Sequence, residues 1–393
     1  MENLTLLTRR TFLQTAALAA APQNRPLRLA VLASVYRPQS DAQHLADHFL
    51  VGYPYAGAWR NPNVKVASLY VAQKPADDLS GARAREFDFR IYPTIPEALR
   101  GGGKELAVDA VLAVADPGAD FLRETAGVLA ADRRTVPVFY YGTLPGTIKS
   151  RPQFPLLAGG FLPVTWRLPS IDVPLDAEIQ EAIVITGKSS GSMDFHALEA
   201  LQCMVERRRG GETGVRSVQL IEGDAVWKAG EEGHWSKELL EAALSRSDLL
   251  LGKTVEDSRP QDMVHSGVLP HIVPKPAAYF IERRDGLRST LLMLNGAVAD
   301  YTFACRLRNV PHPLSTQFFL TPTPNVTYSA CLAANIEEMF ATGQAPYPVE
   351  RTLIVSGILE SCLDSKQQGN RRLNTPHLDV TYQPPKQSHF CRA

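Results

Sequence analysis

The segment GSMDFHALEALQCMVERR, Gly191 to Arg208, carries the pattern around which the chain is organised. Its apolar residues recur at steps of three and four from Phe195 to Val205, which predicts a helix with one face toward a core. His196 and Glu199 follow the same spacing on a neighbouring face, so an imidazole and a carboxylate lie one turn apart and are able to share a proton. A partly buried histidine that a carboxylate merely satisfies has the same spacing, so a structural role stays open.

The composition bounds the class of protein. The chain has 393 residues, of which 45% are hydrophobic and 21% charged, which is enough for two globular domains with real cores. Its 41 Lys and Arg residues balance its 41 Asp and Glu residues, and no long run of like charge occurs. This balance excludes the electrostatic footprint of a nucleic-acid-binding protein and favours small neutral partners. No apolar run approaches the roughly 20 residues of a membrane-spanning helix, so no span is expected.

The N-terminus has the pattern of a targeting segment. Thr8 to Gln14 (TRRTFLQ) resembles the twin-arginine export signal, and an Ala-rich run through Ala21 follows it. We therefore expect residues 1–21 to direct the protein to the periplasm, with cleavage after Ala21. The five cysteines are scattered, and their spacing shows neither a CxxC motif nor a disulfide framework.

The first half of the chain alternates strand and helix patterns. Because each apolar strand run is followed by a helix, the series predicts βαβ units, a parallel sheet with helices on both faces, and a ligand site at the carboxyl ends of the strands. The expected strands are 28–34, 64–71, 91–93, 107–116 and 135–141, and the expected helices are 41–50, 82–87, 95–100 and 119–132.

After Pro155 the pattern changes. A last strand, 156–160, leads into a proline-containing crossing segment, so a domain boundary is expected nearby. Strand patterns at 278–283, 287–294 and 300–308 are separated by Asp285-Gly286 and Asn295-Gly296, which predicts two hairpins. With strands around Ile183, Val218 and 317–320, they predict a mostly antiparallel open sheet of about six strands. A helix capped by Ser236 is expected at 236–246.

The order of these parts resembles the Gfo/Idh/MocA family of NAD(P)-dependent sugar oxidoreductases over nearly the whole mature chain. Three stretches carry the resemblance: Ala82–Arg100 with the strand after it, Asp194–Glu199, and Ile336–Gly369. The resemblance implies a Rossmann-like dinucleotide-binding domain at 25–168 and an α+β substrate and oligomerisation domain at 169–375, with a C-terminal tail at 376–393. It also implies NAD or NADP as cofactor, a sugar-like small-molecule substrate, and association into homo-oligomers.

The cofactor turn departs from the family pattern. Where the family has glycines after the first strand, this chain has Ala33 to Ser40 (ASVYRPQS). Side chains with Cβ atoms, together with Pro38, obstruct the close approach of backbone N–H groups to a pyrophosphate, so Arg37 and Ser40 are candidates to grip phosphate directly. The candidate cofactor-binding residues are Ser34, Tyr36, Arg37, Ser40, Asp116 and Pro117.

One of the candidate catalytic positions also departs from the family pattern. The family's Glu-Lys-Pro after the fifth strand, whose lysine is the usual acid or base, is here Tyr140-Tyr141-Gly142, and Tyr141 serves as a proton donor only if its pKa is perturbed. His196 and Glu199 fall where the family has its histidine and the following acid. The candidate catalytic residues are therefore His196, Glu199, Tyr141 and Asp194, and we expect the segments that carry them to converge on one cleft.

Two functions remain open. One is an exported oxidoreductase that transfers a hydride between a nicotinamide cofactor and a sugar or related polyol. The other is a non-catalytic relative that binds a carbohydrate or a partner and has lost the cofactor. His265 and His271 lie six residues apart without a nearby cysteine, so no metal site is expected.

Overall fold

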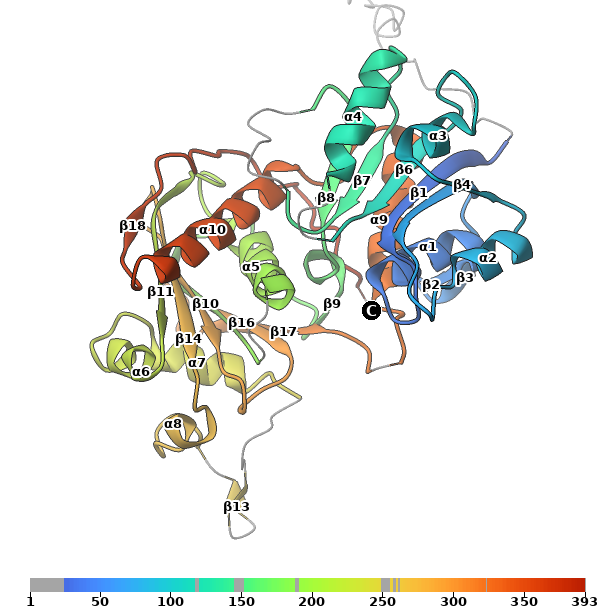
Figure 1. The fold of residues 1–393 in the computed structure, drawn as a ribbon. Coiled ribbons are helices and arrows are strands. Elements are labelled where there is room, and N and C mark those ends of the chain that lie inside the picture. The colour runs from blue at the N-terminus through green and yellow to red at the C-terminus, as the bar shows by residue number, and fades with distance from the viewer. Residues whose placement is uncertain are drawn as a thin grey trace, which may run out of the picture.

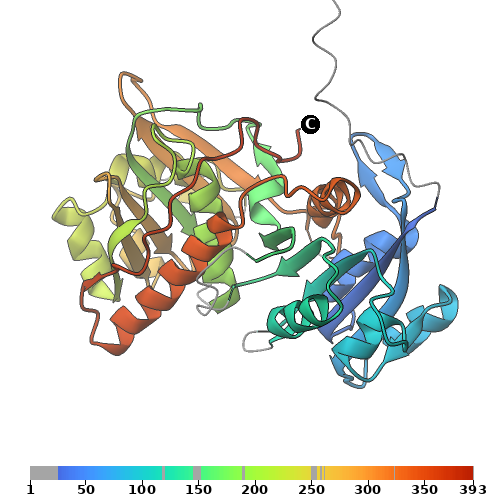
Figure 2. The same ribbon diagram turned by 90° about the horizontal axis from the view of Figure 1, so that it is seen from above.

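The computed structural model describes residues 25–116, 120–144, 152–187, 191–248, 255–256, 259–260, 262–322 and 324–392. Two domains lie side by side, each built on one large sheet (Figures 1 and 2). The expected export signal, at 1–21, and Pro117 lie outside the described residues.

The first domain is a parallel sheet of six strands in the order β5-β4-β1-β6-β7-β8. One face of β1 packs with α1 and the other with α3 and α4, so helices cover both faces as predicted (Figure 1). The strands are β1 Leu27–Val35, β4 Val64–Gln73, β5 Arg90–Tyr92, β6 Ala110–Val114, β7 Val138–Tyr141 and β8 Leu156–Gly159. The helices are α1 Asp41–Val51, α2 Ser80–Glu86, α3 Ile95–Arg100 and α4 Phe121–Ala131, and a hairpin of β2 Tyr53–Tyr55 and β3 Ala58–Arg60 lies between α1 and β4.

Local sequence signals set the ends of two of these helices. The Ser40 side chain accepts a hydrogen bond from the Gln43 N–H and starts α1, and Thr94 does the same for α3 at Glu97. Gly101 ends α3 in the left-handed conformation, at φ 60°, which a residue without a Cβ adopts readily.

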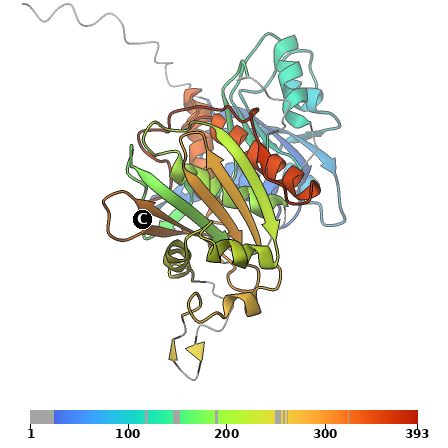
Figure 3. The same ribbon diagram turned by 90° about the vertical axis from the view of Figure 1, so that its left-hand side faces the viewer.

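The second domain is an eight-stranded mixed sheet in the order β18-β11-β14-β15-β10-β16-β17-β9 (Figure 3). All its pairs are antiparallel except β10 with β15. The strands are β9 Trp166–Leu168, β10 Ile179–Thr186, β11 Val215–Glu222, β14 Ala277–Arg283, β15 Arg288–Met293, β16 Tyr301–Leu307, β17 Leu314–Phe319 and β18 Leu373–Asn374. The predicted fold class, a Rossmann-like domain followed by an α+β domain with a mostly antiparallel sheet, is confirmed.

One of the two predicted hairpins is wrong. The turn at Asp285-Gly286 joins the antiparallel pair β14 and β15, as expected. The turn at Asn295-Gly296 does not join neighbours, because β10 lies between β15 and β16 and pairs with both. The interior of β10 is fully buried, with Ile183 and Val184 packed on opposite faces of the sheet. Burial of this strand on both faces outweighs the local preference for a hairpin.

The helices of the second domain cover the two faces of its sheet. One face packs with α5 Gly191–Val205 and α10 Glu350–Gln367, and the other with α6 Asp224–Glu231, α7 Lys237–Leu244 and α8 Leu269–Ile272. The short strands β12 Val255–Glu256 and β13 Arg259–Pro260 pair with each other outside both sheets. None of the described helices is long and apolar enough to cross a bilayer.

The order of the chain does not follow the order of the domains. Strand β9 belongs to the second sheet, whereas helix α9 Ser329–Thr342, much later in the sequence, packs in the same core of the first domain as α1 and β1. The C-terminal tail also crosses between domains: Tyr382 donates to Glu206 at the end of α5, and Cys391 forms a disulfide with Cys331 of α9. The spacing of the cysteines gave no sign of this disulfide, because residues separated by 60 positions meet only in the folded chain.

Candidate functional site

Three of the candidate catalytic residues meet where the first sheet ends and α5 begins. The Tyr141 hydroxyl, on the last residue of β7, lies 3.3 Å from His196 Nε2. On the other side of the imidazole, His196 Nδ1 lies 3.1 Å from Glu199 Oε2. The side chain of Glu199 is 2% exposed and that of His196 is 18% exposed, and Tyr141 is buried. His196 is thus the member of this Tyr141–His196–Glu199 chain that is open to a substrate.

Two glycines at the end of β8 allow this approach. The Gly160 N–H donates to Glu199 Oε1 at 2.8 Å, which holds the carboxylate against the first domain. A Cβ at Gly160 would lie 2.5 Å from the His196 ring, and a Cβ at Gly159 would lie 2.5 Å from Glu199 Oε1. Both distances are shorter than real Cβ contacts, so the site requires glycine at these two positions. The glycine pair that ends the predicted strand was the sequence signal for this role.

The environment of Tyr141 makes it a hydrogen-bond donor and not an acid. Burial raises the pKa of the Tyr141 phenol well above its ordinary value, and the carboxylates of Asp41 and Glu199 raise it further. Its hydroxyl has two acceptors, Asp41 Oδ1 at 3.1 Å and His196 Nε2 at 3.3 Å, but only one hydrogen. The structure therefore does not supply the downward pKa shift that direct proton donation by Tyr141 requires.

Aromatic side chains form the surroundings of Tyr141. Its ring lies 5.0 Å from that of Phe161, which makes an edge-on contact with Tyr328 at 5.2 Å. The Tyr328 hydroxyl lies 3.4 Å from Nδ1 of His44, on the same face of α1 as Asp41. Burial lowers the pKa of His44, and its Nε2 is buried without a hydrogen-bond partner. Sequence reasoning did not select Asp41, His44, Phe161 or Tyr328, because no local motif surrounds them.

Asp194 lies apart from this set. It is buried under the second sheet, where its Oδ2 accepts a 2.7 Å hydrogen bond from Tyr279 of β14. Although it is only two residues from His196, a helix turns by about 200° over two residues, so the two side chains leave α5 on different sides. The structure joins His196, Glu199 and Tyr141 and places Asp194 in the core.

The turn between β1 and α1 is closed on itself. Ser40 Oγ accepts from the backbone N–H groups of Arg37 and Gln43, and Gln39 N–H donates to the Gln43 side chain at 2.7 Å. The Tyr36 hydroxyl donates to Asp47 Oδ1 at 2.5 Å, and the ring is buried in the core of the first domain. Of these candidate cofactor residues, only Arg37 presents an exposed side chain without an ion-pair partner among the described residues.

The remaining candidates bridge two strand ends. Ser34 Oγ, at the end of β1, accepts from the backbone N–H of Asp116 after β6 at 2.8 Å, while the Asp116 side chain is exposed. In the second domain, Glu241, Asp262 and His265 form an exposed cluster outside this site. Asp262 Oδ1 accepts there from the backbone N–H groups of Val264 and His265, and Asp262 Oδ2 lies 2.8 Å from His265 Nδ1, so both of its oxygens already have partners within the protein.

The fold is shared with GenD2 and with inositol dehydrogenases of known structure. GenD2 from gentamicin A biosynthesis, solved with NAD, is similar with a TM-score of 0.54 at 12% identity over 89% of this chain and 96% of that one. The myo-inositol dehydrogenase of Lactobacillus casei, solved with NAD(H) and myo-inositol, is similar with a TM-score of 0.52 at 12% identity over the same shares. The scyllo-inositol dehydrogenase of Lactobacillus casei, solved with NAD(H) and scyllo-inositol, has a TM-score of 0.53 at 10% identity over 89% and 99%.

No family model matches the sequence, and no curated protein matches it either. The similarity therefore lies in the three-dimensional structure, and it extends over both domains. The chain has the two-domain fold of the Gfo/Idh/MocA oxidoreductases, which confirms the resemblance seen in the order of its parts.

Proposed function

We propose that the protein is an oxidoreductase that acts on the hydroxyl group of a polyol or sugar-like alcohol, with His196 as the proton acceptor. The observation that carries this proposal is the Tyr141–His196–Glu199 chain, which joins the carboxyl end of the parallel sheet to the second domain. In parallel α/β sheets this edge is where ligands bind. A hydrogen-bonded histidine that is partly open to a ligand is a suitable general base.

The geometry gives each member of the chain a role. With Nδ1–H donating to Glu199, the neutral His196 ring has its lone pair on Nε2, where it accepts from the Tyr141 hydroxyl. When Tyr141 turns its hydrogen to Asp41, Nε2 is free to take the proton of a substrate hydroxyl. The new Nε2–H then donates to the Tyr141 oxygen, and the Glu199 carboxylate stabilises the imidazolium. Tyr141 and Glu199 are positioning residues, and His196 carries the proton.

A nicotinamide cofactor would supply the hydride acceptor at this edge. In the pose that a glycine turn gives, a diphosphate would displace the internal hydrogen bonds of Arg37, Gln39 and Gln43 and would lie beside the Asp41 carboxylate, so that pose does not fit. The exposed Arg37 guanidinium is available to pair with a phosphate outside the turn. We propose that NAD or NADP binds here through Arg37.

The closed turn also favours a second candidate, a relative that binds a carbohydrate or a partner between its domains without a cofactor. Thermal unfolding with NAD(H) and NADP(H) separates the two, because a ligand at about 100 times its Kd stabilises the folded state by about 2.7 kcal/mol. We expect one of the nucleotides to raise the melting temperature and Arg37→Ala to weaken that effect about fivefold in Kd. Arg371→Ala, at an exposed arginine next to β18, is the matched control and is expected to bind like the wild type. No shift with any nucleotide would leave the cofactor-free candidate.

Activity is tested by following reduced nicotinamide absorbance with polyols. The structural neighbours were solved with myo-inositol and scyllo-inositol, so these are the first substrates to try. Turnover of either compound that depends on His196 would support the proposal, and turnover that persists in His196→Ala would contradict it.

We also propose that the protein is exported through the twin-arginine route. The Cys331–Cys391 disulfide supports this location, because disulfides persist in oxidising compartments such as the periplasm. Replacing Arg9 and Arg10 together by lysine is expected to retain the protein in the cytoplasm, as measured by cell fractionation. Export of the double variant at the wild-type level would contradict this route.

A further inference from the structure

The Tyr141–His196–Glu199 chain continues one residue further on its Tyr141 side. The Tyr141 hydroxyl lies 3.1 Å from Oδ1 of Asp41, the first residue of α1, and 3.3 Å from His196 Nε2. Hydrogen bonds in a resting enzyme site are often this long and shorten when the substrate binds. Four side chains therefore form one series, Asp41–Tyr141–His196–Glu199, which runs from α1 through the end of β7 to α5.

The two ends of this series differ in their access to water. The Glu199 side chain is 2% exposed, and its two oxygens are already used by His196 Nδ1 and by the Gly160 N–H. Asp41, in contrast, is exposed, and no cation lies within ion-pair distance of it among the described residues. Burial lowers the pKa of His44, one turn further along α1, so this ring carries no charge near neutral pH to hold the Asp41 carboxylate. A proton on Glu199 would stay buried, whereas a proton on Asp41 can pass to water.

The surroundings of His196 leave Tyr141 as its polar outlet. Within the described part of the chain, Nε2 of His196 makes a polar contact with the Tyr141 hydroxyl alone. The ring also packs against Gly160, where a Cβ would lie 2.5 Å away, and makes an edge-on contact with Phe195 at 5.5 Å. The 18% of the His196 side chain that is exposed is where a substrate hydroxyl has to approach. A bound substrate therefore covers the direct route from His196 to water.

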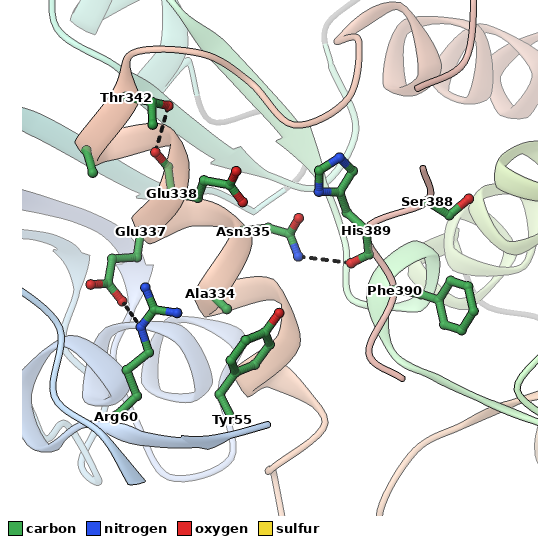
Figure 4. Close-up of a pocket in the computed structure, with 11 residues that line it drawn as sticks. Tyr55, Arg60, Ala334, Asn335, Glu337, Glu338, Thr342, Ser388, His389 and Phe390 are labelled. Carbon is green, nitrogen blue, oxygen red and sulfur yellow. Dashed lines mark hydrogen bonds and ion pairs between the residues drawn. The ribbon is translucent and has the colours of Figure 1, made fainter. Parts of the chain in front are cut away.

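A cavity elsewhere in the first domain gives this proton no other way out. The cavity has a volume of about 500 Å³ and lies between the β2–β3 hairpin, α9 and the C-terminal tail (Figure 4). Its lining contains no member of the Asp41–Tyr141–His196–Glu199 series, and its Arg60 and Glu337 side chains pair with each other at 3.0 Å. The series therefore reaches water at Asp41 and not through this cavity.

Tyr141 is suited to pass a proton without becoming charged. Burial raises the pKa of its phenol well above the ordinary value, and the carboxylates of Asp41 and Glu199 raise it further, so a phenolate is disfavoured here. The hydroxyl has one hydrogen to donate and a lone pair to accept another. It can therefore give its hydrogen to Asp41 only while its oxygen takes the hydrogen of His196 Nε2.

We propose that Asp41 is the proton exit of the site around His196, an inference that rests on the proposed oxidoreductase function. After His196 has taken the substrate proton, its Nε2–H bond breaks as the Tyr141 oxygen binds that hydrogen. In the same step the Tyr141 O–H bond breaks as Asp41 Oδ1 binds the other hydrogen. One proton thus moves from His196 to Asp41, and water then removes it. His196 returns to its neutral form, with Nδ1–H still donated to Glu199.

The first test is a double-mutant cycle on the path. Turnover is followed by reduced nicotinamide absorbance, with NAD or NADP and with myo-inositol or scyllo-inositol. We expect Asp41→Asn to lower kcat at least about tenfold with little change in KM, because an amide does not take up the proton. Tyr141→Phe is expected to lower kcat at least as much, and the double variant is expected to match Tyr141→Phe, because both changes interrupt one path. Effects that multiply in the double variant would contradict a shared path.

Chemical rescue separates proton transfer from a structural role. Asp41 also lies in the first turn of a helix, where a carboxylate stabilises the helix through its dipole. Formate is expected to restore turnover of Asp41→Ala in proportion to its concentration and to leave the wild type and Tyr141→Phe unchanged. The matched control is Asp224→Asn, at the exposed first residue of α6, which loses the same helix-end carboxylate and is expected to keep wild-type turnover.

The outcomes distinguish the exit from the function on which it rests. Wild-type turnover in Asp41→Asn, or no response of Asp41→Ala to formate, would overturn the exit and leave the proposed oxidoreductase function in place. A wild-type protein that turns over neither inositol with either nucleotide would count against the proposed function and, with it, against the exit.

Discussion

Two parts of the same sheet edge differ in where their polar groups point. At β7 and β8, Tyr141 and Gly160 turn their hydrogen-bonding groups across the domain boundary to His196 and Glu199. At β1, the turn before α1 bonds to itself, with Ser40 Oγ accepting two of its N–H groups. The first part links the two domains through hydrogen bonds, and the second is bonded within itself. One strand end of a domain can therefore face a neighbouring domain while the strand end beside it is closed.

The strongest test of this difference is His196→Ala. We expect turnover to fall by about 10²–10⁴-fold, the usual contribution of a general base, with the melting temperature nearly unchanged. The readouts are steady-state kinetics with the best polyol found and thermal unfolding. His234→Ala, at an exposed histidine in the second domain, is the control and should retain wild-type kinetics. Full activity in His196→Ala would remove the functional contrast between the two strand ends.

The next test removes the Cys331–Cys391 disulfide, which ties the C-terminal tail to α9. Cys391→Ser removes a disulfide that closes a loop of 60 residues in sequence separation. The chain-entropy estimate for such a loop is about 4 kcal/mol of stability, to be measured by denaturant unfolding. Cys305→Ser, at a buried free thiol of the second domain, is the comparison that keeps the disulfide. If Cys391→Ser unfolds at the wild-type denaturant concentration, the disulfide does not contribute to the free energy of unfolding.

Helix α1, which begins at the closed turn, carries a buried histidine near its other end that predicts a pH effect. Burial lowers the pKa of His48 on α1 to about 4, and Gly52 and Asp47 only partly oppose this shift. The unfolded chain therefore binds the proton first as the pH falls, so stability is complete above about pH 6.5 and is lost between about 6.5 and 4, by up to about 3 kcal/mol. Unfolding curves across this window should show the loss, and His48→Gln should reduce it. An unchanged pH dependence in His48→Gln would contradict the assignment.

A smaller change tests the contact between β8 and α5. Gly160→Ala places a methyl group against the His196 ring and Glu199, so we expect a loss of about 1–3 kcal/mol in stability together with lower turnover. Gly127→Ala, on α4 with no atom within 4 Å of the new Cβ, is the matched control and should stabilise the helix by about 0.5–1 kcal/mol. Equal effects of the two substitutions would mean that the tight approach at Gly160 is not required.

The sequence determined the local elements and the helix that carries the site. Helices α1 and α3 begin at Asp41 and Ile95, as the sequence predicts, and follow the capping side chains of Ser40 and Thr94. Helix α5 lies in the segment from Gly191 to Arg208, whose apolar spacing predicts a helix. These features depend on residues within one or two turns of each other, so periodicity and capping reveal them. The resemblance in the order of the parts was enough to predict both domains and the meeting of Tyr141 with His196.

Only the tertiary structure decided which distant groups meet. Strand β10 lies between β15 and β16, the Tyr36 hydroxyl donates to Asp47, and Cys331 is joined to Cys391. Likewise, Asp194 and His196 are near neighbours in sequence, yet Asp194 bonds to Tyr279. Which distant groups pair depends on a competition between buried surfaces that are far apart in the chain. The local sequence carries little information about the outcome of this competition.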